Sequence, residues 1–262
     1  MKKTTKRIIV ALLFLSVFCV PISASGKECH WYCIRNKDHK QPPIPQEFAF
    51  VEECNAYFLD HKHSDEAKEK VVYLTFDAGY ENGNVAKTLD VLKKENVPAA
   101  FFVLSHFVRA NADLIERMIT EGHLVCNHTA RHTNLARASK TQITEEIKAL
   151  EADYRDITGK ELSPYFRPPE GSFSREMLEC VAELGYKTVF WSFAYADWDN
   201  EKQPSPEKAF NTVMSNVHNG AVLLLHPTSK TNATILGDVI TTLKAEGYRF
   251  GTLQELCENT CA

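Results

Sequence analysis

The sequence lacks three features that would each indicate a particular class of protein. Its 262 residues contain no internal repeat or low-complexity tract, so nothing points to a repetitive or disordered architecture. Lys and Arg number 30 against 34 Asp and Glu, a balance that does not predict a nucleic-acid partner. No apolar run reaches the roughly 20 residues that a membrane-spanning helix needs. What remains is a globular composition, 44% hydrophobic, with length enough for one large core.

The first 25 residues differ from the rest of the chain. Four basic residues within positions 2–7 precede an apolar run at 8–20, and small residues follow at 21–25, which is the order of a secretory signal peptide. An uncleaved membrane anchor is the alternative, but the run is short for it. Without this segment 26 Lys and Arg remain against 34 Asp and Glu, a net charge of −8. We therefore predict a protein secreted to the cell envelope.

Residues 26–70 are predicted to form an N-terminal extension, and residues 71–262 the main domain. The extension is polar and contains QPPIP at 41–45, which cannot be helical in its middle. Apolar residues within 48–59 are predicted to pack it onto the main domain through a short helix. Seven of the eight cysteines follow the signal segment, and we expect Cys126 and Cys180 to be buried thiols because their neighbours are apolar.

From residue 71 onward, short β-prone runs alternate with helical patterns. The clearest helical face consists of Ile143, Ile147, Leu150, Tyr154 and Ile157, at spacings of four and three, and we predict that it belongs to the core. Seven strands and six crossover helices predict an α/β protein with a parallel sheet or barrel. The predicted strands are 71–76, 99–105, 123–127, 165–167, 187–192, 221–226 and 249–251. The predicted helices are 84–95, 112–121, 141–157, 174–184, 206–217 and 232–246.

The stretch VVYLTFDAGYENG, residues 71–83, contains the first candidate site residue. A buried strand ends in Asp77, and the glycines that follow break the run. In α/β barrels, catalytic side chains collect at the carboxyl ends of the strands. An isolated Asp after a strand is more often the cap of a turn. Catalysis is favoured here because the later strands also end in candidate groups.

Four further constellations follow predicted strands: HTARH at 128–132, RPPEG at 167–171, AYADW at 194–198 and LLLHP at 223–227. The two histidines of HTARH would share a helix face or converge across a turn, and neutral imidazoles are apt ligands for zinc. The paired prolines of RPPEG would stiffen the backbone beside its arginine. Three of them also have a structural alternative: solvated or core histidines for HTARH, a rigid turn for RPPEG, and a capped core residue for LLLHP.

In this order, TFD, H-T-x-x-H, R-P-P-x-G, D-W and L-L-H, the chain resembles the polysaccharide deacetylases of the NodB-homology group, carbohydrate esterase family 4. The longer TFDAGYENG, the QPP at 41–43 and the VFWS at 189–192 more closely resemble its sporulation subgroup, the delta-lactam-biosynthetic de-N-acetylases. The resemblance covers most of the chain after the signal segment. It implies a distorted (β/α)7 barrel of the NodB-homology type with an N-terminal extension, and a hydrolase that acts on a linear amide C–N bond.

The resemblance also implies catalytic roles. Asp77 would be the general base, held ionised by Arg167. His226 would be the general acid, with its pKa raised by Asp197.

The same resemblance implies a metal site and a substrate site. His128 and His132 would hold a divalent metal, zinc by type. Most of the family has a second Asp after the base that completes the metal site, whereas this chain has Ala78, so the metal would be weakly held. The substrate-binding residues would be Trp198, Leu224, Glu170 and Trp191.

The subgroup implies that the substrate is N-acetylmuramic acid in peptidoglycan glycan strands from which an upstream amidase has removed the stem peptides. The product amine would then close to muramic δ-lactam in the spore cortex compartment. Glu170, where many relatives have Tyr and some of the subgroup have Arg, would repel the lactyl carboxylate. The alternatives are an N-acetylglucosamine deacetylase of peptidoglycan or a chitin-like polymer, and an inactive sugar-binding module.

Overall fold

The computed structural model describes residues 26–35 and 38–260, so the predicted signal peptide lies outside the described residues. The strands are β1 (Cys29–His30), β2 (Ala56–Tyr57), β3 (Lys70–Ala78), β4 (Ala100–Val103), β5 (Leu124–Asn127), β6 (Ser163–Phe166), β7 (Ser172–Phe173), β8 (Lys187–Val189), β9 (Ala221–Leu225) and β10 (Tyr248–Phe250). The α-helices are α1 (Val85–Glu95), α2 (Ser105–Ala110), α3 (Ala112–Thr120), α4 (Lys140–Thr158), α5 (Arg175–Glu183), α6 (Pro206–Met214), α7 (Lys230–Ala245) and α8 (Leu253–Thr260). Within these residues no helix is both long and apolar enough to cross a membrane.

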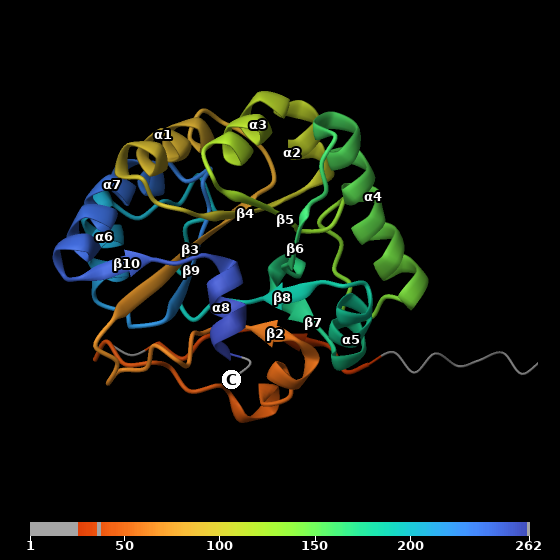
Figure 1. The fold of residues 1–262 in the computed structure, drawn as a ribbon, viewed down its shortest axis with the longest axis horizontal. Coiled ribbons are helices and arrows are strands. Elements are labelled where there is room, and N and C mark those ends of the chain that lie inside the picture. Colours follow the sequence, from red (N-terminus) through yellow and green to blue (C-terminus); the bar gives the residue numbers. More distant parts are fainter. Residues whose placement is uncertain (1–25, 36–37, 261–262) are drawn as a thin grey trace, which may run out of the picture.

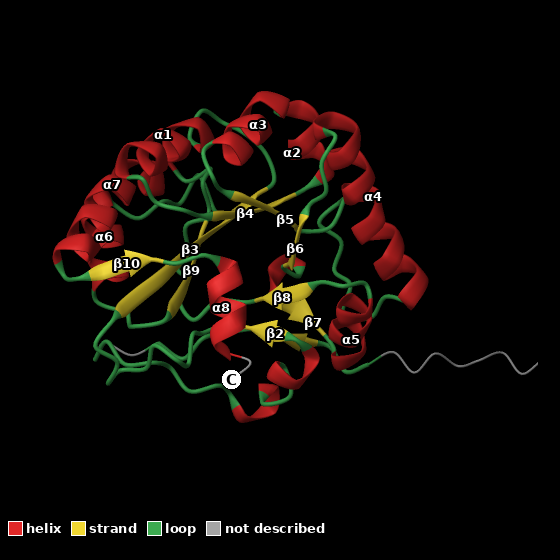
Figure 2. Cartoon of the chain, viewed as in Figure 1, coloured by secondary structure: helices red, strands yellow, loops and turns green. Residues whose placement is uncertain are grey.

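A curled parallel sheet forms the centre of the molecule, and helices surround it (Figures 1 and 2). Its strand order is β10-β3-β4-β5-β6-β8-β2, and β9 also pairs with β3. The sheet curls back on itself because Phe193, just after β8, bridges to Leu223 in β9. All pairs within this sheet are parallel. The predicted α/β barrel fold is therefore confirmed, with every predicted strand position occupied.

The two faces of β3 show how the sheet is packed. Val72, Leu74 and Phe76 belong to the core between sheet and outer helices, together with apolar residues of α1, α3 and α7. Val71 and Tyr73 point to the other face, where α8 covers them with Leu253, Leu256 and Cys257. This two-residue alternation follows from the pleat of a strand.

Helix α4 largely confirms its predicted apolar face. Ile143, Ile147, Leu150 and Tyr154 are buried, but Ile157 is 43% exposed, so its assignment to the core was wrong. Ile157 lies in the last turn of the helix, which ends at Thr158 and is followed by Gly159 in the left-handed conformation. At the other end Ser139 and Gln142 form a capping box.

The N-terminal segment does not contain the short α-helix that was predicted for residues 48–59. It forms two single 3₁₀ turns, Gln46–Phe48 and Glu52–Cys54, and then β2, which pairs with β8. Strand β1 pairs antiparallel with β7. Because most of the contacts that stabilise these short elements lie far away in the sequence, no local periodicity signals them.

Candidate active site

Parallel strands bring the predicted catalytic residues to one edge of the sheet. Asp77 is the penultimate residue of β3, His128 directly follows β5, Arg167 directly follows β6, and His226 directly follows β9. Because these strands run in the same direction, their carboxyl ends meet at one edge. Residues that lie far apart in the sequence are therefore neighbours at this edge of the sheet.

Arg167 is fully buried and orients the Asp77 carboxylate. Its Nη1 donates to Asp77 Oδ1 at 2.8 Å, and its Nη2 donates to Thr75 Oγ1 at 2.9 Å. Its Nε donates to the Val189 carbonyl at 2.9 Å, and its guanidinium lies 4.2 Å from the centre of the Phe102 ring. Burial raises the pKa of Asp77, but the charge and hydrogen bond of Arg167, aided by the charge of His226, outweigh it, so that pKa lies below its ordinary value. Asp77 is therefore ionised at neutral pH and can accept a proton.

His128 is buried beside this pair. Its Nδ1 donates to the Arg167 carbonyl at 2.8 Å, since a carbonyl oxygen can only accept, and its Nε2 lies 3.7 Å from Asp77 Oδ2. Burial lowers the pKa of His128 to about 4, against the opposing charge of Asp77. The imidazole is thus neutral, with the lone pair on Nε2. A ligating histidine characteristically has its other nitrogen fixed in this way.

The donors around His128 fall short of a catalytic zinc site. The His128 and His132 rings lie 5.1 Å apart between centroids, on a loop with positive φ at Thr129 and His132. Within residues 26–35 and 38–260, no three His, Cys, Asp or Glu residues are grouped to hold a metal ion. The neighbouring Ala78 is fully buried and has no donor atom. Two imidazoles are one ligand fewer than the three of a catalytic zinc site, so the residues present do not fit that group and zinc stays a prediction.

His226 and Asp197 form the second pair of predicted catalytic residues. Asp197 is buried, and its Oδ1 accepts from His226 Nδ1 at 2.7 Å while its Oδ2 accepts from the His226 backbone N–H at 2.8 Å. Asn232 in α7 donates to the same Oδ2 at 2.5 Å. Burial lowers the pKa of His226, but the hydrogen bond and charge of Asp197, aided by Asp77, outweigh it and raise the pKa above its ordinary value. A protonated His226 can donate from Nε2.

A pocket of about 880 Å³ connects the two pairs, because Asp77, His128, His132 and His226 all line it. The four predicted substrate-binding residues, Trp191, Trp198, Leu224 and Glu170, also line it.

The RPPEG motif shapes one wall of this pocket through a tight turn. Glu170 has a φ of 59° in the 3₁₀ turn Pro169–Gly171, and Gly171 has a φ of 66°. A Cβ on Gly171 would lie 2.8 Å from the Trp191 ring and 3.2 Å from Cβ of Trp31. Only glycine permits this close approach.

The contribution of the N-terminal segment to the pocket was not predicted from the sequence. Trp31, Tyr32, Cys33 and Arg35 all line it. The indole of Trp31 stacks on Phe190 with centroids 4.4 Å apart, so the segment is packed firmly against the barrel. The sequence carried one weak signal, a tryptophan in a segment rich in polar residues, and none for Arg35.

The arrangement suits hydrolysis of an amide. An ionised carboxylate can take a proton from an attacking water, and an imidazolium on the same pocket can protonate the departing amine. The two groups have pKa values displaced in opposite directions, which is the pattern that separates a base from an acid within one site.

Comparisons with known proteins agree with this chemistry. The chain matches the polysaccharide deacetylase family over residues 64–189. It is 40% identical over 228 residues to the peptidoglycan-N-acetylmuramic acid deacetylase PdaA of Bacillus subtilis, covering 87% of this chain and 85% of that protein. The solved structure of Bacillus subtilis PdaA, a family 4 carbohydrate esterase, matches with a TM-score of 0.83 over 88% of this chain and 97% of that one, at 40% identity. A peptidoglycan-N-acetylglucosamine deacetylase of Bacillus cereus is 32% identical over 72% of this chain and 88% of that protein.

Proposed function

The chain belongs to the polysaccharide deacetylase family, and we propose that it removes the acetyl group from N-acetylmuramic acid in peptidoglycan strands that lack stem peptides. Members of this family are hydrolases of a linear amide C–N bond, and this chain is such an enzyme. The observation that carries the proposal on substrate is the 40% identity to a muramic acid deacetylase over 87% of the chain.

The two catalytic pairs supply the steps of the proposed reaction. Asp77, ionised beside Arg167, takes a proton as water attacks the acetyl carbonyl. His226, protonated beside Asp197, donates its proton to the sugar nitrogen as the C–N bond breaks. Acetate and a free amine are the products. Metal dependence is typical of the family, but the donors present here do not complete a zinc site, and these two proton transfers are assigned to protein side chains alone.

The biological setting is part of the proposal. The protein would be secreted, act in the spore cortex compartment of the cell envelope, and depend on an upstream amidase that exposes its substrate. The free amine would then attack the lactyl carboxyl to give muramic δ-lactam. No nucleic acid takes part.

Deacetylation of N-acetylglucosamine is the second candidate, and Glu170 is the observation that favours it. This carboxylate is exposed on the wall of the catalytic pocket and would repel the anionic lactyl group of muramic acid. N-acetylglucosamine has no such group.

Acetate release from three substrates distinguishes the candidates. We expect release from glycan strands stripped of stem peptides, and much less from strands that keep them and from chitin oligomers of equal length. Preferential release from chitin oligomers would establish the second candidate instead. An inactive sugar-binding module would release acetate from none of them while still binding the strands.

A further inference from the structure

The N-terminal segment brings a cation to the catalytic pocket. Trp31 anchors this segment: its backbone N–H donates to the Gly171 carbonyl at 2.8 Å, and its Nε1 donates to the Trp191 carbonyl at 2.9 Å. Four residues later Arg35 lines the pocket that contains Asp77 and His226. The position of Arg35 is therefore tied to the barrel rather than left to an independent segment.

Arg35 is held in place without being neutralised. Its Nη2 donates to the carbonyl of Ala194, which also lines the pocket, and its guanidinium lies 5.7 Å from the centre of the Phe193 ring. The guanidinium also interacts with the thiol of Cys33. All these partners are neutral, and none of the ion pairs among the described residues involves Arg35. A guanidinium has five N–H donors, so donors remain for a ligand.

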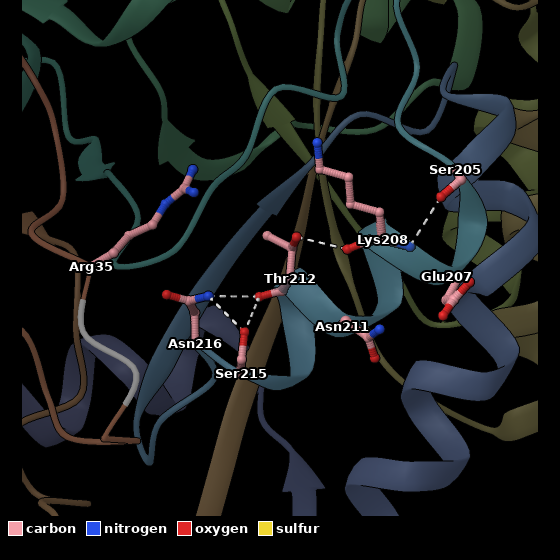
Figure 3. Close-up of a pocket in the computed structure, with 8 residues that line it drawn as sticks. All are labelled: Arg35, Ser205, Glu207, Lys208, Asn211, Thr212, Ser215 and Asn216. Atoms are coloured by element: carbon pink, nitrogen blue, oxygen red, sulfur yellow. Dashed lines mark hydrogen bonds between the residues drawn. The ribbon is translucent and has the colours of Figure 1, made fainter.

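Arg35 also faces a second, polar pocket of about 590 Å³. Figure 3 shows it on the N-terminal segment, opposite residues of α6 such as Thr212 and Lys208. Arg35 is the residue common to the linings of both pockets. A sugar substituent that projects from the catalytic pocket toward α6 would therefore meet this guanidinium.

The charges on the catalytic pocket make Arg35 distinctive. The lining includes two carboxylates, Asp77 and Glu170, and Arg35 is the one Lys or Arg among its lining residues. Asp77 is already paired with Arg167, whereas the exposed Glu170 repels an anion. Protonated His226 is a second cation on this pocket, but its Nε2 proton is assigned to the departing nitrogen. Arg35 is therefore the cation that remains to offset the repulsion between Glu170 and an anionic sugar.

We propose that Arg35 binds the lactyl carboxylate of muramic acid and thereby makes a free carboxylate a condition for efficient turnover. The inference rests on the proposed function. In intact peptidoglycan the lactyl carboxyl is consumed in the amide bond to the stem peptide, so it bears no charge. A guanidinium at this position forms an ion pair with the free carboxylate, whereas it cannot form one with the neutral amide. Arg35 is thus a specificity-determining residue, outside the proton transfers themselves.

The test compares two stem-free substrates that differ only in charge. One is the glycan strand with free lactyl carboxylates, and the other is the same strand with these carboxyls converted to methylamides. For the unaltered protein we expect kcat/KM to be roughly tenfold higher on the carboxylate, as for one charge-assisted hydrogen-bonded contact. Arg35→Gln should abolish that ratio by lowering kcat/KM on the carboxylate while leaving the methylamide within about twofold. Arg35→Lys should keep part of it, since it retains the charge without the planar fork.

Arg155→Gln is the matched control. Arg155 lies in the last turn of α4, half-exposed and paired with Glu161, and does not line either pocket, so this change removes the same charge without touching the site. It should leave the substrate ratio unchanged.

Two results would overturn the inference on Arg35. If Arg35→Gln lowered turnover of both substrates equally, the residue would only support the wall; if it altered neither, it would not contact the substrate. Failure of the proposed function looks different, because the unaltered protein would then release acetate from chitin oligomers in preference to either muramic acid strand.

Discussion

Replacing Asp197 by Asn should move the alkaline limit of activity to lower pH. His226 must be protonated to act as the acid, and its pKa is raised above the ordinary value. A raised pKa keeps the proton in place to a higher pH than in an ordinary histidine, and activity is lost as the pH rises through that pKa. Asp197→Asn removes the charge that opposes this loss while keeping the shape of the side chain.

The magnitude follows from the geometry of the pair. Two opposite unit charges about 4 Å apart attract each other by about 4 kcal/mol at an effective dielectric constant of about 20. As an upper bound, this energy would raise the pKa of His226 by about three pH units. The His226 side chain is 24% exposed, so solvent screens part of this interaction. We therefore expect the alkaline limb to move down by about one to two pH units.

The substitution should also destabilise the fold slightly. Asp197 accepts three hydrogen bonds, two from His226 and one from Asn232, whereas an amide offers one oxygen and turns its nitrogen toward a donor. One unpaired buried donor costs about 1 to 3 kcal/mol, which lowers the melting temperature by several degrees.

The assay is kcat/KM for acetate release between about pH 5 and about pH 10, on the substrate that the unaltered protein turns over fastest. Asp199→Asn is the control. It removes an equal charge only two residues along the chain, and the Asp199 side chain contacts Lys202 and not His226. An alkaline limb at the same pH in Asp197→Asn and in the unaltered protein would refute the assignment of His226 as an acid tuned by Asp197.

Three further changes test other parts of the site. Asp77→Asn should lower turnover about 10²-fold to 10⁴-fold, because the amide cannot accept the proton from water, and retained activity in a protein of normal circular dichroism would disprove the base. Ala78→Asp should lower the melting temperature without metal, because it buries a charge in an apolar cluster, and zinc should restore it more than in Ala78→Asn. An equal zinc response in both would show that position 78 does not reach His128 and His132. Trp31→Ala should cost about 3 to 5 kcal/mol in urea unfolding, because its ring is buried, whereas the half-exposed Tyr32→Ala should cost much less.

The position of the candidate catalytic residues at the ends of strands could be predicted, because a strand and its end are visible in the local sequence pattern. An apolar run that ends in Asp77 or His226 predicts both a strand and the place of its last side chain. In a parallel sheet all such ends lie at one edge, so Asp77, Arg167 and His226 could be grouped before any contact was known. The structure confirms this grouping and adds the distances that define the two pairs.

The resemblance predicted a metal site that the donors do not complete. His128 and His132 do lie together, and the tautomer of His128 suits a ligand. The packing shows that Ala78 is fully buried in an apolar cluster that also contains Ala130, which lies between the two histidines. In the part of the chain that the structure describes, no group of three possible ligands is formed there.

The sequence by itself determined the parallel α/β architecture and the places of Asp77, Arg167 and His226 at strand ends, because strand and helix periodicity and the ends of strands are local properties. The pairing of Asp77 with Arg167 and of His226 with Asp197 was implied by the family resemblance. The tertiary structure alone decided that Trp31 and Arg35 belong to the site. Their contacts join the N-terminal segment to residues about 160 positions later, at Trp191 and Ala194. Such contacts leave no periodic trace in the chain, because they arise only when folding has placed the two segments side by side.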